Sequence, residues 1–235
     1  MCIYNITLIS MKYLIISLFL LVFSCKSNSQ PTAMTNGLTY LALGDSYTIG
    51  ESVAESNRWS VQLAKSLTNA GVVVAEPKII ARTGWTTDEL KAKIVSENIT
   101  QTYDLVSLLI GVNNQYRGRS VEQFRIEFID LLETSLKFSR NIPAHVLVVS
   151  IPDWGVTPFA SDRNQKEIAA QIDLFNSVKK EETEKKGILF VDITPISRQA
   201  VNDKSLIAND GLHPSGKMYQ LWVEKITPEL LKKLK

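Results

Sequence analysis

One serine, one aspartate and one histidine are spaced so that they could cooperate in nucleophilic catalysis. Ser46 follows the apolar run 38–43, where a buried parallel strand would end and release the chain into a loop. Far along the chain, Asp210 precedes His213 by three residues. A serine hydroxyl is a weak nucleophile near neutral pH, so it needs a base and a third group that fixes the tautomer of that base. Ser46, His213 and Asp210 could fill these three roles.

The composition is typical of one globular domain and does not favour a nucleic-acid-binding or disulfide-rich protein. The chain has 235 residues, of which 45% are hydrophobic and 21% charged, and its net charge is +2. This charge is too small and too scattered to indicate binding to nucleic acid. Cys2 and Cys25 lie in the first 25 residues, and the two histidines, His145 and His213, are far apart. We therefore expect no disulfide framework, no metal site and no cofactor.

The N-terminal segment resembles the export signal of a bacterial lipoprotein. A charged start at Lys12 precedes the apolar run YLIISLFLLVF, which is shorter than the roughly 20 residues of a membrane span. The tetrapeptide VFSC, which ends at Cys25, is similar to a lipobox, in which the cysteine is lipidated after cleavage. We expect residues 1–25 to form the signal, residues 26–37 a flexible tether, and translation to begin at Met11. The alternatives are a non-lipidated secretory signal and an uncleaved anchor helix.

The remaining residues, 38–235, alternate apolar runs with helical patterns, and capping boxes begin two of the helices, at Thr86 with Glu89 and at Ser120 with Gln123. Such alternation predicts a parallel sheet with helices on both faces, whose ligand lies beyond the carboxyl ends of the strands. The candidate loops follow the first, second, third and fifth strands, so they should converge there. The expected strands are 38–43, 72–75 with 78–81, 105–110, 145–151 and 188–192, and the expected helices are 58–69, 86–94, 120–138, 163–185 and 215–235, the last bent or restarted at Pro228.

Four short blocks of the sequence resemble, in order, those of the SGNH (GDSL-like) hydrolases. Each block alone is a weak signal, but four in order across residues 38–231 are a strong one. The resemblance implies an α/β, flavodoxin-like three-layer fold with about five parallel strands, and ester hydrolysis through an acyl-enzyme. The blocks are Gly44-Asp45-Ser46, Gly84 in Arg82-Thr83-Gly84-Trp85, Gly111-Val112-Asn113-Asn114 and Asp210-Gly211-Leu212-His213-Pro214.

The resemblance also implies a role for each site residue. It makes Ser46 the nucleophile, His213 the base and Asp210 the group that orients the base. The oxyanion donors would be the backbone N–H groups of Ser46 and Gly84 and the side-chain amide of Asn113. Gly84 can expose its N–H to a substrate without a side chain in the way, and Asn113 is a neutral donor. Such donors stabilise the charge of the tetrahedral intermediate, and each is typically worth ~10²–10³ in turnover.

Some residues depart from the family pattern or allow another interpretation. Asn114 stands where the third block usually has an aspartate, which puts the support of that loop in doubt more than the chemistry. Asp203 is an alternative orienting group for the catalytic histidine. Residues 211–217 match most of a P-loop, but Met218 replaces the hydroxyl residue that would bind magnesium, so we expect no nucleotide site. His145 begins an apolar strand and is expected to be structural.

The motifs leave the substrate open among lysophospholipids, short-chain or aryl esters, and acetyl groups on polysaccharides. Aromatic side chains beside a catalytic serine could hold an acyl chain or stack on a sugar, and Arg117 could bind a phosphate or carboxylate. For Tyr116 and Trp154, plain packing is an equal alternative. The expected substrate contacts are Asp45, Tyr47, Trp85, Asn114, Gln115, Tyr116, Arg117 and Trp154.

For partners, we expect a small-molecule, glycan or lipid ester, no nucleic acid, and contact with a membrane only through the N-terminal lipid. We expect a monomer at the bacterial cell envelope, on the periplasmic or outer-membrane face, with secretion as the alternative. Acyl transfer to an acceptor other than water would use the same residues. A further alternative is a catalytically inactive lipoprotein of this fold that binds glycan or lipid.

Overall fold

A computed structural model describes residues 37–234 of the chain, and its centre is a five-stranded sheet in which every pairing is parallel. The strand order is β2-β1-β3-β4-β5, so the direction of winding reverses between β1 and β3. In open parallel sheets this reversal leaves a crevice at the carboxyl ends of the two strands. The strands are β1 (Tyr40–Gly44), β2 (Lys78–Ala81), β3 (Leu105–Leu109), β4 (Val146–Val149) and β5 (Leu189–Val191).

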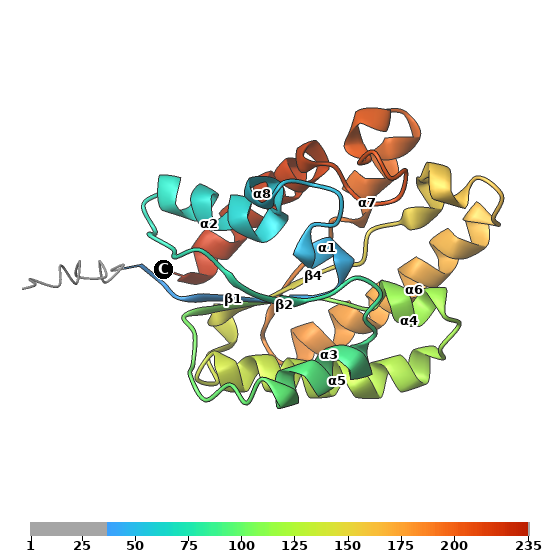
Figure 1. Cartoon of the computed structure of the whole chain (residues 1–235). Coiled ribbons are helices and arrows are strands. Elements are labelled where there is room, and N and C mark those ends of the chain that lie inside the picture. The colour runs from blue at the N-terminus through green and yellow to red at the C-terminus, as the bar shows by residue number, and fades with distance from the viewer. Residues whose placement is uncertain (1–36, 235) are drawn as a thin grey trace, which may run out of the picture. The chain divides into compact units, whose positions relative to one another are not determined.

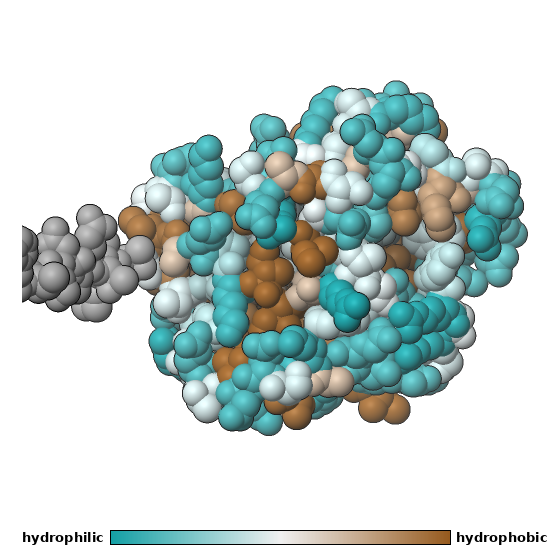
Figure 2. Space-filling view, viewed as in Figure 1, coloured by the Kyte–Doolittle hydropathy of each residue, from teal (hydrophilic) through white to brown (hydrophobic). Residues whose placement is uncertain are grey.

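Helices cover both faces of the sheet, which confirms the predicted α/β architecture (Figure 1). The three inner strands are therefore buried along their whole length, whereas the edge strand β2 is partly exposed. Figure 2, viewed from the same side as Figure 1, shows an apolar strip between hydrophilic side chains. The strip lies over the edge of the sheet that β2 forms. One face carries α2 (Trp59–Asn69) and α8 (Gly216–Leu234), and the other carries α3 (Thr87–Ser96), α5 (Val121–Phe138) and α6 (Gln165–Lys185).

The long helices begin where the sequence supplies caps. The backbone N–H of Thr86 donates to Glu89 Oε2 at 2.9 Å before α3, as the predicted capping box requires. Ser120 Oγ accepts from the backbone N–H of Gln123 at 3.1 Å before α5. The Gln123 side chain, however, donates to Glu127 on the next turn, so only half of the second predicted box is present. These caps satisfy N–H groups that a helix start leaves without partners.

Several predicted boundaries change in the structure. The segment 72–75 forms only an isolated bridge between Val74 and Leu38, so strand two is shorter than expected. The last helix is not restarted at Pro228, which lies inside it. His145 ends a 3₁₀ turn immediately before β4 and lies outside the strand. The predictions for the signal peptide, the lipidated Cys25 and the tether up to residue 36 lie outside the described residues.

Three short helices were not predicted, and two of them follow the strands on either side of the reversal. They are α1 (Ser46–Ile49) after β1, α4 (Val112–Tyr116) after β3, and α7 (Thr194–Ser197) after β5. A segment of four or five residues is too short to show helical periodicity in sequence. Across residues 37–234, no helix has the length and apolar character that crossing a membrane requires.

Candidate active site

The Gly-Asp-Ser block places Ser46 at the end of β1 through two structural requirements, one at Gly44 and one at Asp45. A Cβ on Gly44 would collide with Thr48 and with the backbone oxygen of Leu109 on the neighbouring β3, so only glycine fits there. Asp45 is completely buried and caps α1, because its Oδ1 accepts from the backbone N–H of Tyr47 at 3.1 Å. Ser46 is then the first residue of α1 and lines a pocket.

Asp210 and His213 form a close pair in the loop before α8. His213 Nδ1 lies 2.6 Å from Asp210 Oδ2, and Asp210 Oδ1 accepts from the backbone N–H groups of Leu212 at 2.9 Å and His213 at 3.0 Å. Gly211 makes this turn with a φ of +73°, a conformation that other residues disfavour. The carboxylate therefore holds both the ring and the backbone of the histidine.

The environment of Asp210 keeps its carboxylate ionised. Partial burial raises its pKa, but hydrogen bonds from Ser52 Oγ, from two backbone N–H groups and from the His213 ring outweigh burial, so the pKa lies well below its usual value. Asp203, the alternative orienting group, instead accepts from Lys217 Nζ at 2.8 Å and from the backbone N–H of Ser205 at 3.0 Å. The structure thus pairs the histidine with Asp210.

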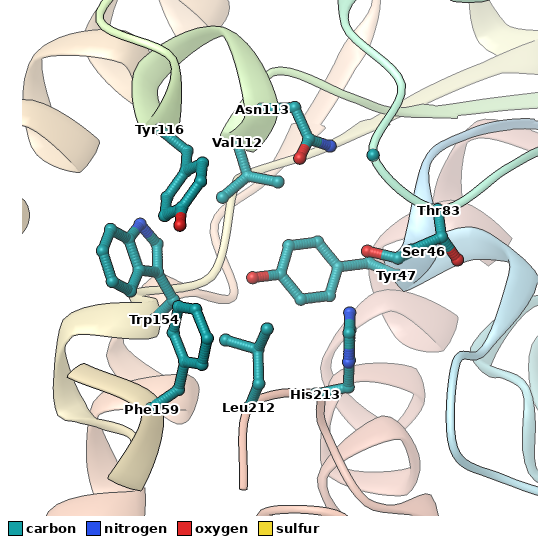
Figure 3. Close-up of a pocket in the computed structure, with 11 residues that line it drawn as sticks. Ser46, Tyr47, Thr83, Val112, Asn113, Tyr116, Trp154, Phe159, Leu212 and His213 are labelled. Carbon is teal, nitrogen blue, oxygen red and sulfur yellow. The ribbon is translucent and has the colours of Figure 1, made fainter. Parts of the chain in front are cut away.

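Ser46 and His213 face one pocket, which Gly84 and Asn113 also line (Figure 3). The ring of His213 lies below Ser46 in this view and points a nitrogen towards it. Since Nδ1 is bound to Asp210, that nitrogen is Nε2. The pocket has a volume of about 180 Å³. The four blocks of the sequence therefore meet at the carboxyl edge of the sheet, as expected.

Gly84 and Asn113 are tied to each other's loops. Gly84 has a φ of +86°, and an added Cβ would meet only Arg117 Nη2, at 3.8 Å, so conformation and not space favours glycine here. Its carbonyl accepts from Arg117 Nη2 at 2.6 Å. Asn113 Nδ2 donates to the backbone oxygen of Trp85 at 2.9 Å, which leaves the second amide hydrogen for a ligand.

A buried lysine that sequence reasoning missed lies beneath the site. Lys179 Nζ donates to the backbone oxygens of Ile110 at 2.9 Å and Val149 at 2.8 Å, just beyond β3 and at the end of β4. It also lies 5.6 Å from the centre of the Phe128 ring. Lys179 continues the buried stripe of α6 formed by residues 168, 172 and 175. This helical spacing is the sequence signal that could have indicated its burial. The lysine therefore anchors the strand ends from which two active-site loops leave.

Burial brings the pKa values of this lysine and of the nearby aspartate close together. It raises the pKa of Asp45 to about 7, although the Tyr47 N–H and the charge of Lys179 act in the opposite direction. It lowers the pKa of Lys179 to about 7, against the charge of Asp45. Both groups are wholly buried, and neither lines the pocket. They support the site from below and do not contact a ligand there.

The structure corrects several predicted substrate contacts. Asp45 caps α1 and is buried, and Asn114 is also buried, where its Oδ1 accepts from the Thr87 N–H at 3.1 Å. Asn114 thus supports the start of α3, although it replaces the aspartate that the third block usually has. Arg117 is held by the Gly84 carbonyl and by Glu89, with its Nη1 3.3 Å from Glu89 Oε1.

Other predicted contacts divide between the pocket and the core. Trp85 packs partly buried against the core and does not line the pocket, and Gln115 is buried beside Trp154. Tyr47, Tyr116 and Trp154 do line it. The lining also includes four residues that the sequence did not single out as substrate contacts: Thr83, Val112, Phe159 and Leu212.

Comparisons with solved structures support the fold at low sequence identity. TesA matches with a TM-score of 0.64 and 20% identity, covering 84% of this chain and 99% of its own. The psychrotrophic esterase EstA from Pseudoalteromonas sp. gives 0.63 and 16%, covering 83% and 98%. Axe2, an acetylxylan esterase from Geobacillus stearothermophilus, gives 0.59 and 17%, covering 84% and 94%. These likenesses show a shared fold.

The family of the protein follows from a comparison of its sequence with protein-family models. A comparison with curated proteins finds no match. The sequence model of the GDSL-like Lipase/Acylhydrolase family, however, matches residues 42–221, which include all four blocks and every residue of the Ser46 pocket. The protein therefore belongs to the GDSL-like lipase/acylhydrolase family.

Proposed function

We propose that the protein is a serine esterase that cleaves carboxylic esters through an acyl-enzyme, with Ser46 as the nucleophile. The observation that carries this proposal is the 2.6 Å pairing of His213 Nδ1 with Asp210, which leaves Nε2 facing the pocket that Ser46 lines. Lysophospholipase-like and carbohydrate acetylesterase-like reactions both fall within this class.

In the first half of the reaction, Ser46 Oγ attacks the carbonyl carbon of the ester while His213 Nε2 takes the hydroxyl proton. Asp210 keeps the remaining proton on Nδ1 and stabilises the imidazolium that forms. The negative charge on the former carbonyl oxygen is met by the backbone N–H groups of Ser46 and Gly84 and by the Asn113 amide.

In the second half, His213 returns the proton to the departing alcohol oxygen, and the acyl group stays on Ser46 as an ester. A water molecule then loses a proton to His213 and attacks the acyl carbon, and the same donors hold the second oxyanion. Collapse of this intermediate releases the carboxylic acid and returns the proton to Ser46 Oγ. Every group that these steps need lines the pocket or binds one that does.

The comparisons support the proposal at the level of the reaction class. The matched family is named for lipases and acylhydrolases. Two structural neighbours, EstA and Axe2, are an esterase and an acetylxylan esterase, and EstA has been solved in a form inhibited by monoethylphosphonate. Phosphonates mimic the tetrahedral intermediate of acyl transfer, so a phosphonate probe is a suitable test for Ser46.

The test is hydrolysis of p-nitrophenyl esters by the full chain, with Ser46→Ala and the exposed Ser56→Ala as matched variants. We expect Ser46→Ala to remove essentially all enzymatic hydrolysis with unchanged circular dichroism, and Ser56→Ala to behave as wild type. A fluorophosphonate should label wild type and Ser56→Ala only. Hydrolysis retained in Ser46→Ala would refute the assignment, and absence of both hydrolysis and labelling in wild type would favour a binding protein.

A further inference from the structure

Five apolar or aromatic side chains gather across the pocket from Ser46 (Figure 3). They come from three separate segments, which are α4, the 3₁₀ turns 154–160 after β4, and the loop just before His213. The ring centres of the three aromatic residues lie between 5.4 and 6.4 Å apart, so the rings are in mutual contact. The five residues, called here the apolar wall, are Val112, Tyr116, Trp154, Phe159 and Leu212.

The back of the apolar wall is fixed before any ligand arrives. Trp154 is 5% exposed, and its Nε1 donates to Gln115 Oε1 at 2.8 Å. Gln115 in turn donates from Nε2 to Gln171 Oε1 at 2.6 Å. The polar atom of the tryptophan is therefore satisfied inside the protein, and its ring offers only apolar surface to the pocket. A preformed apolar surface loses little freedom when it binds an apolar group.

The front of the apolar wall stays open to solvent. Tyr116 is 49% exposed and Phe159 is 43% exposed, although each touches Trp154 and lines the pocket. Apolar surface held in a pocket and left open to water favours a ligand that covers it. Covering it with a methyl group would leave most of this surface wet.

The size of the pocket sets the size of the group that fills it. Its volume is about 180 Å³. An apolar cavity of roughly 150 Å³ in a protein is large enough to bind benzene. Part of this space, beside Ser46, Gly84 and Asn113, is taken by the ester carbonyl. The pocket therefore accommodates an acyl group of about six carbon atoms in all, either with a ring or as a short chain. An acetyl group would leave most of it empty and lose the corresponding contacts.

The reaction geometry directs the acyl side of the ester to the apolar wall. The carbonyl oxygen must lie between Gly84 and Asn113, and the departing alcohol oxygen must be within reach of His213, which protonates it. Figure 3 places Asn113 and His213 on opposite sides of the Ser46 hydroxyl and the apolar wall in a third direction. The acyl substituent takes this third direction.

The charge of the lining excludes ionised acyl groups. None of the described residues that line the pocket is an aspartate, glutamate, lysine or arginine. Arg117, which the sequence suggested for binding an anion, is already bound to the Gly84 carbonyl and to Glu89. Burial, together with nearby carboxylates, raises the pKa of the Tyr47 hydroxyl, so this group stays neutral. A carboxylate at the end of the acyl chain would find no positive partner.

We propose that the apolar wall is an acyl-binding site for uncharged groups of about six carbon atoms, aromatic or aliphatic, and that acetyl esters are poor substrates. This inference rests on the proposed ester hydrolysis and specifies its substrate class. It separates the protein from an enzyme that removes acetyl groups, for which most of the apolar wall would have no function.

The experiment measures kcat/KM of the full chain on p-nitrophenyl acetate, butyrate, hexanoate, decanoate and benzoate, each divided by its hydroxide-catalysed rate. Four additional buried methylenes, at about 0.8 kcal/mol each, correspond to a ratio on the order of 100-fold. Because the pocket is open on one side, we expect hexanoate to exceed acetate by about 10- to 100-fold. Benzoate should also exceed acetate. Equal rates, or a preference for acetate, would overturn the inference.

Phe159→Ala tests the apolar wall directly, because this half-exposed side chain can be removed without opening the core. We expect about a tenfold lower kcat/KM on hexanoate and a much smaller loss on acetate. The matched control is Leu174→Ala, since Leu174 is 50% exposed on α6 and does not line the pocket. An equal loss on both esters in Phe159→Ala would count against a role in acyl binding.

A second readout separates failure of this inference from failure of the proposed function. Inactivation rates of Ser46 are compared for p-nitrophenyl methylphosphonate and hexylphosphonate esters, which report the acyl side without turnover. Faster inactivation by the hexyl reagent supports the inference even where no ester is turned over, and faster inactivation by the methyl reagent overturns it alone. No labelling of Ser46 together with no hydrolysis would overturn both proposals.

Discussion

At the scale of single residues, Asp210 holds His213, the proposed base, and its turn through three hydrogen bonds. One carboxylate oxygen binds the His213 ring, and the other accepts two backbone N–H groups of the same turn. Ser52 Oγ also donates to the ring-binding oxygen at 2.7 Å. The charge of the carboxylate is thus stabilised by the groups that it positions. A neutral amide would keep the size of the side chain and lose both the charge and the correct tautomer of the ring.

We therefore expect Asp210→Asn to lower kcat by about 10⁴-fold, since this is the cost of the wrong histidine tautomer in such a triad. The matched control is Asp203→Asn, which changes a carboxylate of the same segment that binds Lys217 and Ser205. Steady-state kinetics of both variants on one ester measure the two losses in kcat. A comparable loss in both variants would contradict the pairing of His213 with Asp210.

At the scale of secondary-structure elements, the loop after β2 depends on an unusual backbone conformation at Gly84. Gly118, after α4, has a similar positive φ of +65° and equally open space around its Cα, but it does not line the pocket. Any other residue at either position carries strain of about 1–2 kcal/mol. The two glycines therefore separate the effect of strain from the effect on the site.

We expect Gly84→Ala and Gly118→Ala to lower the free energy of unfolding by a similar amount, about 1 kcal/mol. Only Gly84→Ala should also lower kcat, by about tenfold or more, because relief of the strain turns the backbone N–H away from the oxyanion. Urea unfolding and kinetics are measured on both variants. Unchanged kcat in Gly84→Ala would argue against an oxyanion role for this N–H group.

Lys179 connects α6 to the strand ends that carry the site. Lys179→Met keeps the length of the buried chain but leaves the carbonyls of Ile110 and Val149 without their donor and Asp45 without a nearby cation. We expect a loss of about 3 kcal/mol in the free energy of unfolding. Lys180→Met, on the exposed face of the same helix, should lose almost nothing. Similar urea midpoints for the two variants would show that the buried ammonium is not needed.

The elements differ in how far sequence could predict them. The run 105–110 is apolar throughout because its strand is covered on both faces, and Thr86 and Ser120 mark helix starts by local chemistry. Helices α1 and α4 are too short for periodicity, so only the structure shows that Asp45 caps one and that Asn114 braces the other against Thr87. Local patterns predict local structure well and the support of a site poorly.

At the scale of the whole molecule, the order of the blocks predicted the edge of the sheet where Ser46 and His213 meet, but not the apolar wall opposite Ser46. Short sequence motifs surround Ser46, Asn113 and His213, so these residues could be recognised from the sequence. Phe159 and Leu212 become part of the pocket only because the turn after β4 and the loop before α8 come together: the Phe159 N–H donates to the Gly211 carbonyl at 3.0 Å. Contacts between loops that are distant in sequence leave no periodic signal.

A charged cluster at the amino ends of the strands, opposite the pocket, stabilises the fold. Asp104, just before β3, accepts from the Thr39 N–H at 2.9 Å, from Thr39 Oγ1 at 2.7 Å and from Arg140 Nη1 at 2.8 Å. Partial burial raises its pKa, but hydrogen bonds from Arg140 and Thr39 outweigh burial and lower the pKa from 3.8 to about 2. This cluster joins the starts of β1 and β3, far from the pocket.

Because the folded pKa of Asp104 lies below its unfolded value, its stabilisation is complete above about pH 4 and is lost as the pH falls towards 2. After allowance for solvent screening, we expect Asp104→Asn to lower the free energy of unfolding by about 1 kcal/mol at pH 6. The difference from wild type should shrink steadily between pH 4 and pH 2.5, with kcat/KM at pH 7 unchanged. Urea unfolding across this range measures it, with the exposed Asp162→Asn as the control. A difference that stays constant with pH would show that the charge of Asp104 contributes nothing, and altered kcat/KM would show that the two edges of the sheet are coupled.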